Sequence, residues 1–159
     1  FLLELYRRYR FMGTKYQGTV EETVALDTYI KFVRAFDAMK GRIEAQNTVG
    51  DLSGSQFGTV EMLYHLGPLT QKDIGQKLLI SKSNVVTVID KLEARGFVKR
   101  QRGVEDRRCV FVHLTEDGRE KIEEILPVHV AAITEEMSHL SPQEQKEFGR
   151  LCRKLGLAA

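Results

Sequence analysis

Two helix patterns joined by a short turn lie between residues 70 and 94, and they constrain the fold of this chain more than any other feature. The second pattern begins at Ser81, whose hydroxyl can cap the free backbone amides of a first helical turn. Thr70, with Asp73 three residues later, gives the same kind of start signal for the first pattern. Gly75 lacks a side chain, so the two helices can cross closely beside it. The apolar residues of the second pattern recur at i, i+3, i+4 and i+7 on one inward stripe, Val85, Val88, Ile89 and Leu92. This spacing predicts a helix-turn-helix.

Two strand patterns follow the second helix pattern. Gly96 is expected to stop that helix, because glycine accepts the left-handed conformation that often follows a last turn. Residues 97–102 and 109–114 then form two expected strands joined by a short loop. In the second of them, every other residue from Val110 to Leu114 is aliphatic, which is the period of a strand. The sequence therefore predicts a mainly α fold with a small β-hairpin wing (α+β), that is, a winged helix-turn-helix.

The polar face of the second helix is the candidate site. Ser83, Thr87 and Asp90 fall opposite the apolar stripe at 100° per residue. Small hydroxyl, amide and methyl groups on such a face suit the base edges of a DNA major groove, and the flanking lysines suit phosphates. The alternative is that this face is simply solvated and that its lysines are ordinary surface residues. The candidate DNA-binding residues of this helix are Ser81, Lys82, Ser83, Asn84, Val86, Thr87 and Lys91.

The tip of the predicted hairpin collects arginines beside acidic residues. An arginine at such a tip can enter the narrow minor groove, where the negative potential is strongest. Arg102 and Arg107 are the leading candidates, whereas Arg108 either joins them or pairs with Asp106. Asp106 is expected to orient a neighbouring guanidinium, because a carboxylate facing phosphates would repel them.

The charge is distributed unevenly along the chain. The whole chain carries a formal net charge of only +2, which identifies no partner. Residues 71–108 hold ten Lys and Arg against five Asp and Glu, whereas residues 116–147 hold three against nine. The positive charge thus coincides with the helix-turn-helix and the hairpin, which favours double-stranded DNA as a partner.

The run from Ser55 to Gly118 resembles the MarR family of bacterial transcription regulators. The resemblance rests on SQFGTVEMLYHLGPLTQKDIGQKLLISKSNVVTVIDKLEARGFVKR, followed by DRRCVFVHLTEDG. It implies an obligate homodimer in which terminal helices form the dimer lobe and one winged domain per subunit binds an inverted-repeat operator. For many members it also implies release from DNA by a small ligand or by oxidation. We therefore expect a DNA-binding regulator that acts as a repressor.

Two helix start signals follow the predicted hairpin. Thr115 is expected to cap a long acidic helix that bends or breaks near Pro127. Ser141, Pro142 and Glu144 supply the cap, the first-turn proline and the capping-box acid of a last helix.

The flanking segments contain amphipathic helix patterns with more apolar surface than a winged domain needs. We expect one MarR-like domain over residues 1–159, with its winged helix-turn-helix at residues 52–115. Residues 1–47 and 116–159 are then the helical dimerisation region, since a second copy is the simplest cover for their apolar faces. Two reading helices would lie about 34 Å apart, one helical turn of DNA.

Other classes of site find little support in the sequence. Cys152 lies in an apolar stripe, and Cys109, near the wing arginines, is also interpreted as structural because it has no evident resolving partner. The reactive cysteine that redox-sensing relatives carry near the N-terminus does not occur in this sequence. The four histidines show neither an i, i+4 pair nor a CxxC knuckle, so no metal site is predicted. No catalytic motif is present, so we expect no enzyme.

The remaining expectations concern surroundings and partners. No apolar run approaches the 18 residues of a membrane span, and the opening segment is too short in its apolar part for a secretory signal. We expect a cytoplasmic protein with no cofactor other than a small-molecule effector of unknown identity. Two alternatives stay open, a winged-helix adaptor for protein interaction without specific DNA and a metal-sensing or thiol-sensing regulator.

Overall fold

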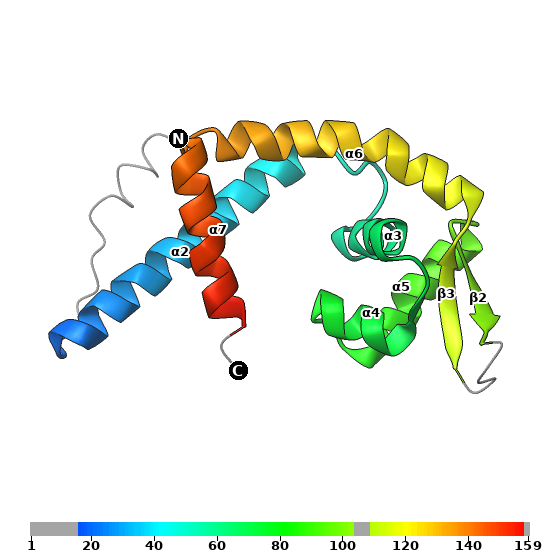
Figure 1. The fold of residues 1–159 in the computed structure, drawn as a ribbon, viewed down its shortest axis with the longest axis horizontal. Helices are drawn as coiled ribbons and strands as arrows, with labels where there is room; N and C mark the ends of the chain where they lie inside the picture. Colours follow the sequence, from blue (N-terminus) through cyan, green and yellow to red (C-terminus); the bar gives the residue numbers. More distant parts are fainter. Residues whose placement is uncertain (1–15, 104–108, 158–159) are drawn as a thin grey trace. The chain divides into compact units, whose positions relative to one another are not determined.

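The structure, a computed structural model, describes residues 16–103 and 109–157. The chain divides into two compact units, residues 1–45 and 46–159 (Figure 1). In the first unit the described residues form one long helix, α2 (Val20–Ala45). Thr19 begins this helix, because its hydroxyl accepts a hydrogen bond from the backbone N–H of Glu22, whose carboxylate accepts one from the backbone N–H of Thr19. None of the residues of α2, all of which the structure describes, is buried.

The second unit contains a small antiparallel sheet and five helices within its described residues. The elements are α3 (Gly54–Leu66), β1 (Leu69–Thr70), α4 (Gln71–Leu78), α5 (Lys82–Ala94), β2 (Val98–Arg102), β3 (Val110–Leu114), α6 (Glu116–Met137) and α7 (Pro142–Gly156). The predicted fold class, mainly α with a small β-hairpin, is therefore confirmed.

The sheet has the strand order β1-β3-β2. The predicted hairpin is formed by β2 and β3, which pair from Val98 opposite Leu114 to Arg102 opposite Val110. Each strand begins one residue later than the sequence predicts. A third strand, β1, was not predicted; it is only two residues long and pairs with Val112 and Phe111 of β3.

The core of the second unit joins the helix-turn-helix, the sheet and the first half of α6. Val60 of α3, Ile74 of α4, Ile89 of α5, Val112 of β3 and Ile122 of α6 are each 0% exposed. Burying these side chains removes apolar surface from water and provides the main favourable term for folding. The helix α5 is therefore held on the same core as the sheet.

The two C-terminal helices begin where the sequence predicts. Thr115 caps α6, and Pro127, which was expected to bend or break this helix, lies inside one continuous element. Figure 1 shows α6 as an unbroken, arched helix, so the proline does not end it. Ser141 and Glu144 form a complete capping box at the start of α7, with Pro142 in the first turn.

Candidate nucleic-acid interface

The candidate site is built around α5, whose first turn is fixed by Ser81. Ser81 has extended backbone angles (φ −65°, ψ 154°), and its hydroxyl accepts a hydrogen bond from the backbone N–H of Asn84 at 3.4 Å. The Ser83 hydroxyl lies 3.1 Å from the Ser81 hydroxyl. The predicted cap is therefore confirmed, and it aligns the first turn of α5.

The two faces of α5 divide as the apolar spacing predicts. Val85, Ile89 and Leu92 are buried at 2%, 0% and 0% exposure. The opposite face is open to solvent and carries Ser83, Asn84, Thr87 and Lys91, with Lys82 and Val86 at its side. The structure thus leaves all six of these predicted residues exposed.

The Thr87 hydroxyl is held by its own helix. Its Oγ1 atom donates a hydrogen bond to the backbone carbonyl of Ser83 at 3.1 Å. Because the hydroxyl proton is used in this way, the side chain is fixed in one orientation and keeps an acceptor oxygen and a methyl group for a partner. These two groups suit a base amino group and a thymine methyl respectively.

The helix α4 crosses α5 closely at Gly75. A methyl group on Gly75 would lie 2.9 Å from Cγ2 of Val85, so the contact depends on the missing side chain, as the sequence predicts. The turn between the helices is also confirmed. Leu79 ends α4 with a φ of 54°, and the backbone N–H of Ile80 donates to the carbonyl of Gly75 at 3.1 Å.

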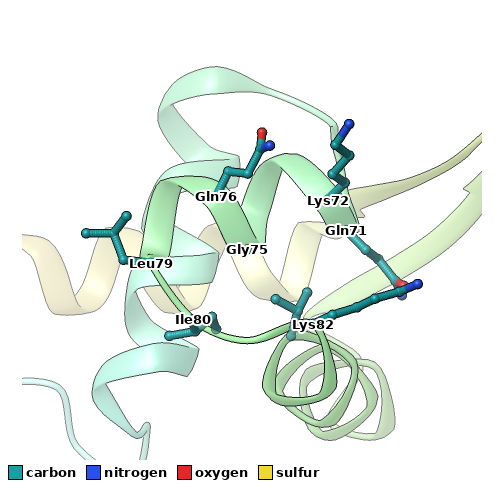
Figure 2. A pocket seen from close by; sticks show the side chains of 8 residues that line it. Gln71, Lys72, Gly75, Gln76, Leu79, Ile80 and Lys82 are labelled. Carbon is teal, nitrogen blue, oxygen red and sulfur yellow. The ribbon is translucent and has the colours of Figure 1, made fainter. Parts of the chain in front are cut away.

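An open pocket of about 570 Å³ lies between α4 and the start of α5. Figure 2 shows Lys72 and Gln76 projecting from α4, Leu79 just after it, and Lys82 in the first turn of α5. The lining thus combines apolar side chains with two lysines, which add positive charge to this part of the helix-turn-helix. The lining residues are Gln71, Lys72, Gly75, Gln76, Leu79, Ile80, Lys82 and Val85.

Asp90 does not stand free on the exposed face, where the sequence analysis placed it beside Ser83 and Thr87. Its carboxylate pairs with the guanidinium of Arg100 on β2 at 2.5 Å, and Glu93, one turn further along α5, pairs with the same guanidinium. Partial burial on its own would lower the pKa of Arg100, but the hydrogen bonds to Asp90 and Glu93 raise that pKa above its ordinary value. The helical period could not predict this pair, because it depends on how β2 packs against α5.

The C-terminal end of α5 is tied to the loop before α3. Arg95 donates to the carboxylate of Asp51 at 2.7 Å, and its guanidinium lies 4.7 Å from the ring centre of Phe97. The Arg95 side chain, mainly through its hydrogen bond, lowers the pKa of Asp51 below its ordinary value. Gly96, with φ 75°, then turns the chain into β2 as predicted.

The predicted wing is described only at its base. Arg102 is exposed at the end of β2, and the backbone N–H of Gly103 donates to the carbonyl of Cys109 at 2.9 Å. The other predicted wing residues, Asp106, Arg107 and Arg108, lie outside the described residues.

Within residues 16–103 and 109–157, no group of three or more His, Cys, Asp or Glu side chains is arranged to hold a metal ion. In the same part of the chain, no helix is long and apolar enough to cross a membrane.

Comparisons with known sequences agree with this geometry. The model of the MarR family matches residues 52–110. The uncharacterized HTH-type transcriptional regulator YkoM of Bacillus subtilis is 36% identical over 133 residues, which cover 84% of this chain and 86% of YkoM. The HTH-type transcriptional regulator MhqR of the same organism is 30% identical over 135 residues, covering 85% of this chain and 93% of MhqR.

Solved structures show the same architecture. BpsR of Bordetella bronchiseptica, whose DNA binding is regulated by 6-hydroxynicotinic acid, superposes with a TM-score of 0.73 at 25% identity, covering 92% of this chain and 100% of that one. Sco3205 of Streptomyces coelicolor, a MarR family regulator solved in complex with DNA, gives a TM-score of 0.75 at 24% identity, covering 92% of this chain and 93% of that one. At 24% identity, the similarity to Sco3205 shows a shared fold only.

Proposed function

We propose that this chain, which belongs to the MarR family of DNA-binding transcriptional regulators, acts as a homodimeric repressor that reads an inverted-repeat operator and is released by a small ligand. The family and the similar proteins are transcriptional regulators and not enzymes, in agreement with the expectation from the sequence. The proposal goes beyond the family in naming the reading residues, the assembly and the mode of release.

The observation that carries the proposal is the division of α5 into two faces. Its apolar stripe is buried, so the face that bears Ser83, Asn84 and Thr87 points to solvent, and a major groove admits a helix of this kind. Lys82 and Lys91 flank this face and are proposed to contact phosphates. We propose that Ser81 and Val86 complete the reading surface.

The wing supplies the second proposed contact. Arg102 is exposed at the end of β2, and we propose that it and Arg107 approach the minor groove, with Arg108 beside them. Asp106 would orient these guanidinium groups. The wing residues act on DNA of any sequence, because phosphates and groove walls carry little sequence information.

The proposed dimer uses the helical flanks, residues 1–47 and 116–159. The stripe on α7 is open in the single chain, where Phe148, Leu151 and Leu155 are 41%, 44% and 68% exposed. A second copy of the chain would cover this surface and place two reading helices about 34 Å apart on one face of DNA. Sedimentation of the purified protein tests this step, and a monomer at micromolar concentration would contradict it.

The proposed effector is a small molecule that binds the free dimer better than the DNA-bound dimer, because only such a difference in affinity can shift the equilibrium. The regulation of BpsR by 6-hydroxynicotinic acid suggests aromatic carboxylic acids as the first compounds to test. A rise in melting temperature together with release of DNA would support the proposal. We place this regulation in the cytoplasm, where the chromosome is accessible.

The test of the central proposal is selection from genomic DNA. The protein is mixed with random genomic duplex fragments at two salt concentrations, and the fragments retained at the higher one are sequenced. Enrichment of an inverted repeat with half-sites one helical turn apart is expected. Binding without enrichment would contradict sequence-specific reading, and the absence of binding at either salt concentration would favour a protein-interaction adaptor.

A further inference from the structure

Arg100 lies on β2 but contacts the helices of the helix-turn-helix. Its guanidinium pairs with Asp90 and Glu93 of α5. With the Gln71 amide oriented so that its oxygen faces Arg100, this oxygen accepts hydrogen bonds from Nε at 2.8 Å and from Nη2 at 3.2 Å. Gln71 is the first residue of α4. One side chain therefore connects β2, α4 and α5.

The backbone of Arg100 takes part in the same connection. Its N–H donates to Oε1 of Glu93 at 2.9 Å, while the side chain of Glu93 also meets the guanidinium. Because β2 is an edge strand of the sheet, this bond satisfies a backbone donor on the α5 side of the strand. The Glu93 carboxylate is thus held by both the backbone N–H and the guanidinium of Arg100. These two contacts fix the position and the angle of α5 against β2.

The pairing also changes the charge of the exposed surface. Asp90 is 57% exposed, and it lies one turn beyond Thr87 on the proposed reading face. An unpaired carboxylate at this place would repel the phosphates of a bound duplex. The Arg100 side chain, only 24% exposed, offsets part of this charge from the side of the protein, since it is shared with Glu93.

We propose that Arg100 is a positioning residue for DNA recognition, which sets the angle of α5 relative to the wing strand β2 and offsets part of the charge of Asp90. This inference rests on the proposed function, since it assigns the residue that aligns the proposed reading helix. Arg100 acts through the residues of α5 and does not itself read bases. Its planar, forked guanidinium suits this role, because it bonds several acceptors in fixed directions and a lysine ammonium does not.

The test compares specific with general binding. The affinity of each variant is measured for the selected operator and for a scrambled duplex of equal length, at fixed salt concentration. We expect Arg100→Gln to lower the ratio of these affinities by about tenfold, which corresponds to about 1.4 kcal/mol. Arg100→Lys keeps the positive charge and should preserve binding to the scrambled duplex but not the ratio. Arg150→Gln is the matched control, since Arg150 pairs with Glu147 on α7 and, at 100° per residue, lies on the side of this helix away from the apolar stripe of the proposed dimer. It should leave the ratio unchanged.

Asp90→Asn separates positioning from direct contact. If Arg100 positions α5, the loss of its partner should lower the ratio even though the variant removes a negative charge. An unchanged or increased ratio would show that the pair of Asp90 with Arg100 does not align α5 for reading, and it would overturn the inference. Circular dichroism and the melting temperature establish whether each variant is folded. If Arg100→Gln does not fold, Asp90→Asn still tests the inference.

The proposed function and the role of Arg100 are distinguished by different results. A wild-type protein that prefers no duplex would overturn the proposed function and this role together. A wild-type preference that Arg100→Gln and Asp90→Asn both retain would overturn only the role of Arg100.

Discussion

The hydroxyl of Thr115 donates a hydrogen bond to the backbone carbonyl of Gly96 at 2.6 Å. The same oxygen accepts from the backbone N–H of Gly118 at 3.1 Å and so caps α6. A single side chain thus joins the start of α6 to the turn that follows α5. The end of the proposed reading helix is thereby fixed to the helix that leads into the proposed dimerisation region.

We expect Thr115→Ala to lower the free energy of unfolding by about 1 to 2 kcal/mol, because both the cap and the bond to Gly96 are lost. Urea unfolding followed by circular dichroism measures the change. Thr134→Ala is the control, because Thr134 is exposed within α6 and its hydroxyl donates to the backbone carbonyl of Val130 in the same helix. Equal effects of the two substitutions would contradict the proposed importance of the Thr115 connection.

Gly118 is the position at which a single methyl group should be most disruptive. A Cβ atom there would overlap the carbonyl oxygen of Phe97 and lie 2.8 Å from Cδ1 of Leu114. We expect Gly118→Ala to destabilise the fold by about 1 to 3 kcal/mol, because backbone must move to accommodate the methyl group. In Gly149→Ala the added atom meets nothing within 4 Å, so the helix should be stabilised by about 0.5 to 1 kcal/mol. Thermal unfolding of both variants measures these changes in stability. An unchanged melting temperature in Gly118→Ala would show that the contact between Gly118 and the Phe97 carbonyl does not require glycine.

The capping box of α7 should make stability depend on acidic pH. Hydrogen bonds from the hydroxyl and the backbone N–H of Ser141 lower the pKa of Glu144 from its ordinary value of 4.5. A carboxylate with a depressed pKa in the folded state stabilises the fold above its unfolded pKa, and this contribution is lost as the pH falls through the folded pKa. The melting temperature of the wild-type protein should therefore exceed that of Glu144→Gln near neutral pH, and the gap should close below pH 4.5. A gap that stays constant across this range would show that ionisation of Glu144 is not involved.

Lys82 should contribute charge to binding but little sequence preference. We expect Lys82→Ala to weaken binding to operator and scrambled duplexes equally, and to reduce the slope of log K against log salt by about one unit. Lys146→Ala, on α7, should leave the slope unchanged. A loss confined to the operator would assign Lys82 to base reading instead of phosphate contact.

The helix boundaries of the second unit could be predicted because their signals are local. Ser81, Thr115 and Ser141 each accept a hydrogen bond from a backbone N–H three residues later, which depends only on the chain nearby. Gly96 ends α5 for an equally local reason, its positive φ. The buried stripe of α5 followed from the helical period.

The features that were missed depend on tertiary contacts. The strand β1 exists only because Leu69 and Thr70 pair with β3, some forty residues later. The role of Arg100 has the same origin, since its carboxylate partners lie on a different element. A weak sequence signal for the ion pairs with Arg100 does exist. Asp90 and Glu93 lie three residues apart, and a tight turn and a strand with an arginine follow them. Many exposed carboxylates share that spacing, so it does not identify a partner. Pattern alone placed Asp90 on the proposed reading face and could not supply its partner.

The most direct test of the central claim is to repeat the genomic selection with Thr87→Asn. If the exposed face of α5 reads bases, the enriched half-site should change at one or two positions, because an amide pairs with adenine in a way that a hydroxyl and a methyl group do not. The spacing between half-sites should stay the same, since the assembly is untouched. An unchanged enriched sequence would contradict base reading by Thr87 and, with it, the assignment of this face of α5.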